Sequence, residues 1–132
     1  MALITDQPGL NRLAAWQDQR LGVLADSTAI AVVRSRLPRL TLVPYASYQA
    51  ALAGLRQGEA DGFAGDATVL AGWVQAHPAY AVVGPRLSTE PLAVALPKGL
   101  QHESLRRAIE QSLTQGQRSG WLGQQARRWG LF

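Results

Sequence analysis

The chain has 132 residues, a formal net charge of +4, 47% hydrophobic residues and no cysteine. This length allows a single domain with a sizeable core, and the apolar content excludes an intrinsically disordered chain. Without cysteine there are no disulfide bonds or thiolate metal sites, and no stretch approaches the ~18 apolar residues of a membrane-spanning helix.

Residues 1–19 form a lead-in segment, in which residues 10–19 could make a short helical turn. From residue 20 onward, short apolar runs alternate with segments of helical periodicity. The apolar runs predict four strands, at residues 20–25, 40–45, 60–65 and 80–83. Each of the first three runs is followed by residues that favour helix N-caps, so helices are expected to begin near Thr28, Ser47 and Asp66.

The alternation of strands and helices over residues 20–86 predicts an α/β lobe. The connections are short enough for right-handed crossovers, which make successive strands parallel and place helices on the faces of the sheet. We therefore expect a three-layer sandwich with a mostly parallel sheet. Pro44 restricts the second strand to a sheet edge or a strand end, and Gly58 supplies the left-handed position that ends the second helix.

Residues 87–132 have a different character. An extended run bounded by prolines spans residues 90–97, and two helices are predicted at about residues 101–115 and 117–129. Helical spacing places large apolar side chains on one face of each helix, where burial is the default. These side chains are Leu105, Ile109, Leu113, Trp121, Leu122 and Trp129.

Two strand-to-helix junctions, at Asp26-Ser27-Thr28 and at Asp66, carry the candidate binding residues. Both should open on the same edge of the sheet, because they follow the carboxyl ends of parallel strands. The helix start at Ser27 and Thr28 could hold a carboxylate through N–H groups and a hydroxyl, and ionised Asp66 could accept hydrogen bonds from an ammonium group. This pair suits a zwitterion such as an amino acid. The same residues are also explained as helix caps, worth about 1 kcal/mol each, so both interpretations stay open.

Signals of catalysis, cofactor binding and nucleic-acid binding are missing from the sequence. There is no nucleophile elbow, P-loop, GxGxxG motif or pair of histidines at metal-ligand spacing, so neither an enzyme nor a cofactor or metal is predicted. His77 fits a helix terminus and His102 a surface position. The basic residues are dispersed rather than clustered, which argues against a nucleic-acid partner.

Four stretches between about Arg20 and Gly130 read RLGVLADST, YQAALAGLRQGEADGFAGD, EPLAVALPKG and ARRWG. Their order and spacing resemble the extracellular solute-binding proteins of polar amino-acid ABC transporters, in the type II periplasmic-binding-protein family. By this resemblance, residues 20–83 correspond to the second lobe and residues 90–97 to the strand that returns through the hinge. The two C-terminal helices would belong to the first lobe. The resemblance implies a periplasmic or extracellular location, although residues 1–9 lack a signal-peptide pattern.

The resemblance implies a non-enzymatic domain that binds an amino acid or a similar zwitterion for transport, with a membrane permease as partner. It assigns Ser27 and Thr28 to the ligand's α-carboxylate and Asp66 to its α-ammonium. Asp26 stands where the family usually has glycine, and its charge would oppose a carboxylate there. The alternatives are a ligand-sensing domain of a receptor or transcriptional regulator with the same fold, and an enzyme such as a binding-protein-like dehydratase.

The first half of the family's first lobe has no counterpart in the sequence. Missing with it are the arginine that clamps the ligand's carboxylate and the aromatic residues that sandwich its side chain. A truncated binding protein is therefore expected, with the C-terminal helices deprived of the sheet that they normally cover. Because an apolar face of this size is not left in water, we expect these helices to pack on the lobe, pair with another copy or stay mobile. We predict a homodimer through these helices or an exchange of C-terminal segments between copies.

Overall fold

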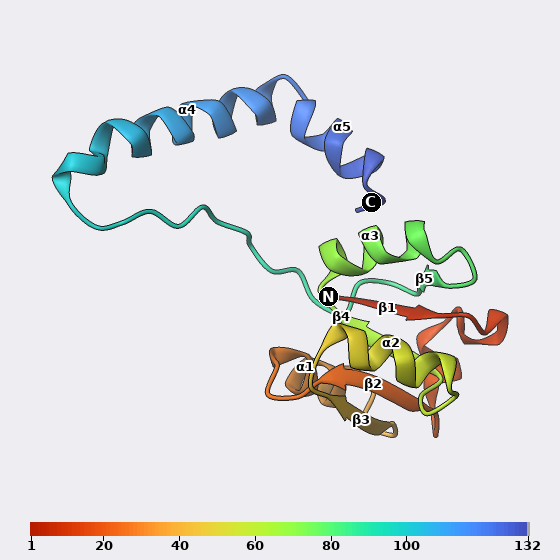
Figure 1. Ribbon diagram of the computed structural model, residues 1–132. Helices are drawn as coiled ribbons and strands as arrows, with labels where there is room; N and C mark the ends of the chain where they lie inside the picture. Colours follow the sequence, from red (N-terminus) through yellow and green to blue (C-terminus); the bar gives the residue numbers. More distant parts are fainter. Residues whose placement is uncertain (132) are drawn as a thin grey trace. The chain divides into compact units, whose positions relative to one another are not determined.

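The computed structural model describes residues 1–131. The chain divides into two compact units, one at Met1–Glu90 and one that begins at Pro91 (Figure 1). The first unit contains a sheet with its covering helices, and the second contains two helices after a long extended segment. No helix in the described residues is both long and apolar enough to cross a membrane.

A five-stranded sheet in the order β3-β2-β4-β1-β5 forms the centre of the first unit. β2 pairs in parallel with both β3 and β4, whereas β1 pairs antiparallel with both β4 and β5. Four of the five strands therefore run in one direction. The strands are β1 (Ala2–Thr5), β2 (Arg20–Leu24), β3 (Thr41–Tyr45), β4 (Gly62–Gly65) and β5 (Ala81–Val83).

Helices pack on both faces of this sheet, which confirms the predicted α/β fold with three layers and a mostly parallel sheet. The bounds are η1 (Pro8–Leu10), η2 (Leu13–Trp16), α1 (Thr28–Arg36), α2 (Tyr48–Arg56) and α3 (Ala67–Ala76), where η marks a 3-10 helix. One apolar cluster joins Leu21 and Val23 of β2 to Val33 of α1. The other joins Phe63 of β4 to Leu55 of α2 and Leu70 of α3. Successive side chains of a strand point to opposite faces of the sheet, so the strands contribute residues to the helix layers on both sides.

Several local predictions are confirmed. Pro44 lies in β3, which is an edge strand, and Gly58 has a φ of 72° just after α2. The Ser47 hydroxyl accepts a hydrogen bond from the Ala50 N–H at 3.1 Å and caps α2. Asp66 caps α3 in the same way, through the N–H of Thr68 at 2.8 Å. Turn and cap chemistry therefore set the ends of the central helices.

The first 19 residues differ from the predicted lead-in segment. Residues Ala2–Thr5 form β1, an inner strand of the sheet, and all four are buried. Trp16 is fully buried and donates its indole N–H to the Leu10 carbonyl at 2.9 Å. Its three apolar residues and one threonine do not alternate, so they give no strand signal of their own, and only pairing with distant strands defines β1.

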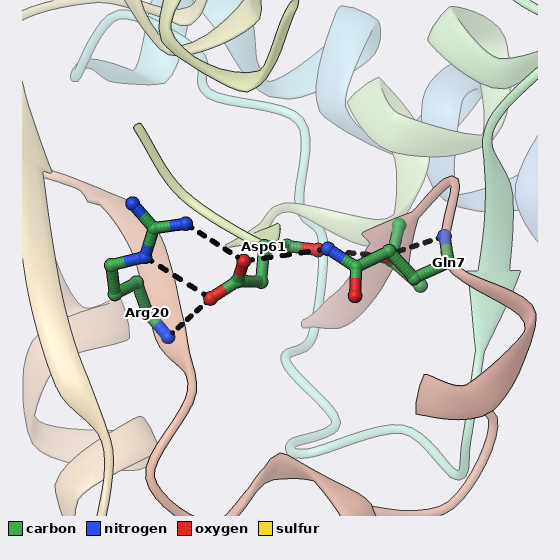
Figure 2. A network of polar contacts seen from close by, with 4 residues as sticks. Gln7, Arg20 and Asp61 are labelled. Carbon is green, nitrogen blue, oxygen red and sulfur yellow. Dashed lines mark hydrogen bonds and ion pairs between the residues drawn. The ribbon is translucent and has the colours of Figure 1, made fainter. Parts of the chain in front are cut away.

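A polar cluster ties β1, β2 and β4 together at the end where β2 and β4 begin (Figure 2). The Asp61 carboxylate accepts hydrogen bonds from the Arg20 backbone N–H at 2.8 Å and from Arg20 Nη2 at 2.9 Å. Gln7 Nε2 donates to the same carboxylate at 3.4 Å, and the Thr5 hydroxyl donates to the Asp61 carbonyl at 2.6 Å. Burial alone would raise the pKa of Asp61, but the hydrogen bonds from Arg20 and Gln7 outweigh it and lower the pKa below its ordinary value.

The second unit contains η3 (Leu100–His102), α4 (Glu103–Arg118) and α5 (Trp121–Arg128), so the predicted helix pair is confirmed. The extended run at residues 90–97 is not a strand, since it has no neighbouring strand to pair with in the described residues. The expected burial of the tryptophans is wrong: Trp121 is 55% exposed and Trp129 is 54% exposed. Neither helix contributes a buried residue, because a helix pair alone has no layer to close over its apolar face.

Candidate functional site

A pocket of about 130 Å³ opens at the carboxyl edge of the sheet in the first unit. Its polar lining comes from three strand-to-helix junctions and from the end of the unit. The residues that matter for its chemistry are Ser27, Thr28, Tyr48, Gly65, Asp66 and Glu90. The pocket therefore contains three of the four candidates from the sequence, and Asp26 does not line it.

Strand register explains why these junctions meet. In the parallel pair of β2 and β4, Val23 lies opposite Ala64, so the two strands end side by side. β3 ends level with β2, with Leu24 opposite Tyr45 and the Ala25 N–H donating to the Tyr45 carbonyl at 2.8 Å. The helices that follow all begin at this edge, as the rule for ligand sites in open α/β sheets predicts.

The α1 junction is not closed by its own cap. Ser27 occupies the N-cap position, but its hydroxyl donates to the Leu24 carbonyl at 2.7 Å and accepts no bond from the helix. Within residues 1–131, the N–H groups of Thr28 and Ala29 have no acceptor, and the Thr28 hydroxyl has no partner. The capping explanation therefore fails for Ser27. The first turn of α1 presents unpaired donors and a positive dipole end at the pocket.

Asp26 takes a different role from the one expected for a pocket residue. Its φ of 56° is in the left-handed region, which aspartate tolerates better than most residues. It makes the turn between β2 and α1, and its side chain is exposed. No hydrogen bond or ion pair ties this carboxylate to any other described residue.

Asp66 is both a cap and an available carboxylate. Its Oδ1 accepts hydrogen bonds from the Thr68 N–H at 2.8 Å and from the Thr68 hydroxyl at 2.7 Å. These bonds from Thr68 lower the pKa of Asp66 below its ordinary value, so the group is ionised at neutral pH. The backbone N–H of Val69 and the positive charge of the chain's N-terminus also act on this carboxylate and lower its pKa further. The side chain is exposed, and a carboxylate has about four acceptor positions, so Asp66 can accept a further hydrogen bond from a cationic group in the pocket.

Two lining residues, Tyr48 and Glu90, were missed by the sequence analysis. Tyr48 is the first residue of α2, and its hydroxyl oxygen accepts the Asp66 backbone N–H at 3.3 Å. Glu90 accepts a hydrogen bond from the Ser88 hydroxyl at 3.1 Å. Sequence could have found Tyr48, because the junction between β3 and α2 follows a parallel strand just as the other two junctions do. No local pattern marks Glu90, because its position depends on the path of the chain after β5.

Two other pockets do not combine polar groups from several strand-to-helix junctions. One of about 620 Å³ runs along α4 in the second unit and is lined by one helix and Ser119. The other, of about 210 Å³, lies in the first unit between Leu13 and Leu40 with a mainly apolar lining. Neither collects polar groups from several strand ends. No group of three or more histidine, cysteine, aspartate or glutamate side chains in the described residues could hold a metal ion.

Comparison in sequence finds a relative among curated proteins. This is the putative ABC transporter arginine-binding protein 2 of Escherichia coli, which is 34% identical over 70 residues. The match covers 53% of this chain and 29% of the relative. No family model matches the chain.

Comparison of structures finds the same fold in several amino-acid-binding proteins. An ancestral arginine-binding protein bound to glutamine has a TM-score of 0.66 and 21% identity, over 97% of this chain and 58% of that one. A substrate-binding protein of Streptococcus pneumoniae bound to L-arginine has a TM-score of 0.69 and 19% identity, over 97% and 55%. An arginine-specific periplasmic binding protein of Salmonella typhimurium has a TM-score of 0.64 and 22% identity, over 97% and 58%.

The chain spans less than a third of the curated relative and little more than half of these solved structures. In both the ancestral and the Salmonella typhimurium proteins, the structural match extends over 97% of this chain. The resemblance to the solute-binding proteins of amino-acid ABC transporters is thus confirmed, and the chain has the fold of part of such a protein.

Proposed function

We propose that this chain is the ligand-binding part of a solute-binding protein that recognises an amino acid or a similar polar zwitterion for an ABC transporter. One observation carries the proposal. The uncapped start of α1 and the exposed carboxylate of Asp66 line the same pocket at the carboxyl edge of the sheet. Donors for an anion and an acceptor for a cation therefore lie a short distance apart.

The chemistry of each half of the pocket follows from its charges. The N–H groups of Thr28 and Ala29, with the Thr28 hydroxyl, suit a carboxylate, because they are unpaired donors at the positive end of a helix dipole. Asp66 suits an ammonium group, because a charge-assisted hydrogen bond is about twice as strong as a neutral one. In this proposal, Ser27 shapes the turn through its bond to Leu24, and Asp26 acts on a bound carboxylate only through repulsion over a distance.

The proposed setting follows the relatives. Those relatives are named as arginine-binding, substrate-binding and periplasmic binding proteins. We therefore propose binding rather than catalysis, in the periplasm or outside the cell, with a membrane permease as partner. Because the chain spans about half of such proteins, we propose that it binds ligand weakly alone. Hinge-closing receptors gain affinity by enclosing the ligand between two lobes. We also propose self-association through α4 and α5.

NMR titration with L-arginine, L-glutamine and L-cysteine tests the function, since it detects binding even at millimolar affinity. We expect chemical-shift changes at residues of the pocket. Asp66→Asn should weaken binding by about 30-fold or more, because it removes one partner of a charge pair. Asparagine caps helices about as well as aspartate, so the fold should survive this change.

Asp18→Asn is the matched control, because Asp18 is also an exposed aspartate and lies before β2, at the other end of the sheet from the pocket. Its variant should bind as the wild type does. If the folded wild type shows no chemical-shift change with any of the three amino acids, the proposed function is refuted. If Asp66→Asn binds as tightly as the wild type, the role of this carboxylate is refuted.

A further inference from the structure

We propose that the Tyr48 hydroxyl is a ligand-binding donor in this pocket, directed to the anionic group of the bound zwitterion. This inference rests on the proposed function and adds a residue to its site. Tyr48 lines the pocket together with Thr28 and Asp66, although it comes from a different strand-to-helix junction. It would complete the set of donors around the carboxylate half of the ligand.

The position of Tyr48 is fixed by its neighbours. The cap at Ser47 sets the first turn of α2, on which Tyr48 is the first residue. The phenol ring packs edge-on against the Phe63 ring, with 5.6 Å between centroids and an interplanar angle of 64°. At its far end, the hydroxyl oxygen accepts the Asp66 backbone N–H at 3.3 Å. The side chain therefore crosses from α2 to the end of β4.

Gly65 provides the space for this crossing. A Cβ at Gly65 would lie 3.3 Å from both Cε1 and the hydroxyl oxygen of Tyr48, and 2.8 Å from Cε1 of Phe63. Contacts this short would force the aromatic rings to move. The glycine at the last position of β4 thus allows the phenol to lie across the strand end, beside the Asp66 carboxylate.

The hydrogen bonds of Tyr48 leave one group unused. A phenol can accept through its oxygen and donate one proton. The oxygen is occupied by the Asp66 N–H, but no acceptor for the hydroxyl proton exists in residues 1–131. A half-buried donor without a protein acceptor at a pocket wall is available to a ligand.

The donors and the acceptors in the pocket can now be sorted by charge. Tyr48 joins the Thr28 hydroxyl and the two free N–H groups of α1 as donors, and all of these suit a carboxylate. The carboxylates of Asp66 and Glu90 are the acceptors that line the pocket, and they suit an ammonium group. Because Tyr48 also holds the backbone N–H of Asp66, one side chain would link the two halves of the site.

Tyr48→Phe tests the inference, since it removes the hydroxyl and keeps the ring against Phe63. Titrations with L-arginine, L-glutamine and L-cysteine should show about tenfold weaker binding than the wild type for the ligand bound best. The midpoint of thermal unfolding should change little, because the ring packing remains. Tyr80→Phe is the control, because Tyr80 lies in the first unit and does not line the pocket.

A second measurement separates contact with the ligand from a purely structural role. In protein labelled with ¹³C at the tyrosine Cζ atoms, the signal missing from Tyr48→Phe should shift when ligand is added, and the Tyr80 signal should not. Equal affinities of wild type and Tyr48→Phe, or a Tyr48 signal that stays in place at saturation, would overturn the inference and leave the proposed function standing. A wild type that binds no member of the panel would overturn both.

Discussion

The two units of the chain treat their apolar side chains in opposite ways. In the first unit, Leu21 and Phe63 are almost completely buried, and apolar clusters fill both sides of the sheet. In the second unit, Leu113 is 43% exposed and Trp121 is 55% exposed, and α4 and α5 bury no residue. The first unit therefore buries its apolar side chains in a core of its own, whereas the second unit leaves an apolar helix face exposed.

Amphipathic periodicity therefore predicts a helix, but it does not guarantee that another layer of the protein covers the apolar face. The solved proteins with this fold are longer, and the chain covers 55% to 58% of those described above. The remainder of those proteins has no counterpart here. Within the described residues, no layer covers the apolar face of α4 and α5.

The largest expected contrast between the units is in stability. Leu21→Ala, in the core of the first unit, should lower the free energy of unfolding by about 3 kcal/mol, because it leaves a cavity. Leu113→Ala, on the exposed face of α4, should lower it by about 0.5 kcal/mol or less. Urea titrations followed through the amide NMR signals of β2 and β4 measure both. Equal losses for the two variants would mean that α4 belongs to the same core.

A smaller difference in stability is expected between two carboxylates that pair with arginine, one in each unit. Asp61 ties three strands through Arg20 and Gln7, whereas Glu103 pairs with Arg106 and Arg107 on the surface of α4. Hydrogen bonds from Arg20 and Gln7 lower the pKa of Asp61, and those from Arg106 and Arg107 lower that of Glu103. Asp61→Asn should lower the free energy of unfolding by about 1–2 kcal/mol at neutral pH. The loss is no larger because Arg20 is partly exposed and water screens its charge. Glu103→Gln should leave the urea midpoint unchanged.

The Asp61 contribution should also depend on pH. The folded state holds the proton of Asp61 less tightly than the unfolded chain does, because its pKa is lowered on folding. Its contribution is therefore complete above about pH 4 and is lost as the pH falls through the folded pKa. The difference between wild type and Asp61→Asn should shrink below about pH 4. A difference that stays constant down to acid pH would show that the charge of Asp61 is not involved.

Sequence alone predicted the parts of the fold that local chemistry controls. Ser47 and Asp66 mark helix starts, Gly58 a helix end, and Pro44 an edge strand. It failed for β1, because three apolar residues and a threonine become a strand only by pairing with β4 and β5. It also failed for the burial of the α5 tryptophans, which depends on a covering layer rather than on their spacing.

For the candidate site, sequence alone brought the α1 junction and Asp66 to one edge, because parallel strands share a direction. It could not decide between cap and binding site, since that choice depends on single hydrogen bonds. The Ser27 hydroxyl bonds to Leu24 instead of capping α1, and Asp66 caps α3 while its side chain stays exposed at the pocket. The place of Tyr48 in the site was not predicted, because its side chain passes Gly65 and bonds to Asp66, and such contacts between distant residues leave no local sequence pattern.

The smallest expected effect is self-association of the full chain. The apolar face of α4 and α5 should make the protein dimerise weakly, so that light scattering gives a mass that rises from monomer toward dimer with concentration. Leu113→Glu should keep the protein monomeric over the same range, because it places a charge in the middle of that face. Val69→Glu is the matched control, since Val69 is also 43% exposed but lies on α3 of the first unit. A wild type that remains monomeric at every concentration would exclude this dimer. An equal effect of both variants would point to general surface hydrophobicity instead of the face of the second unit.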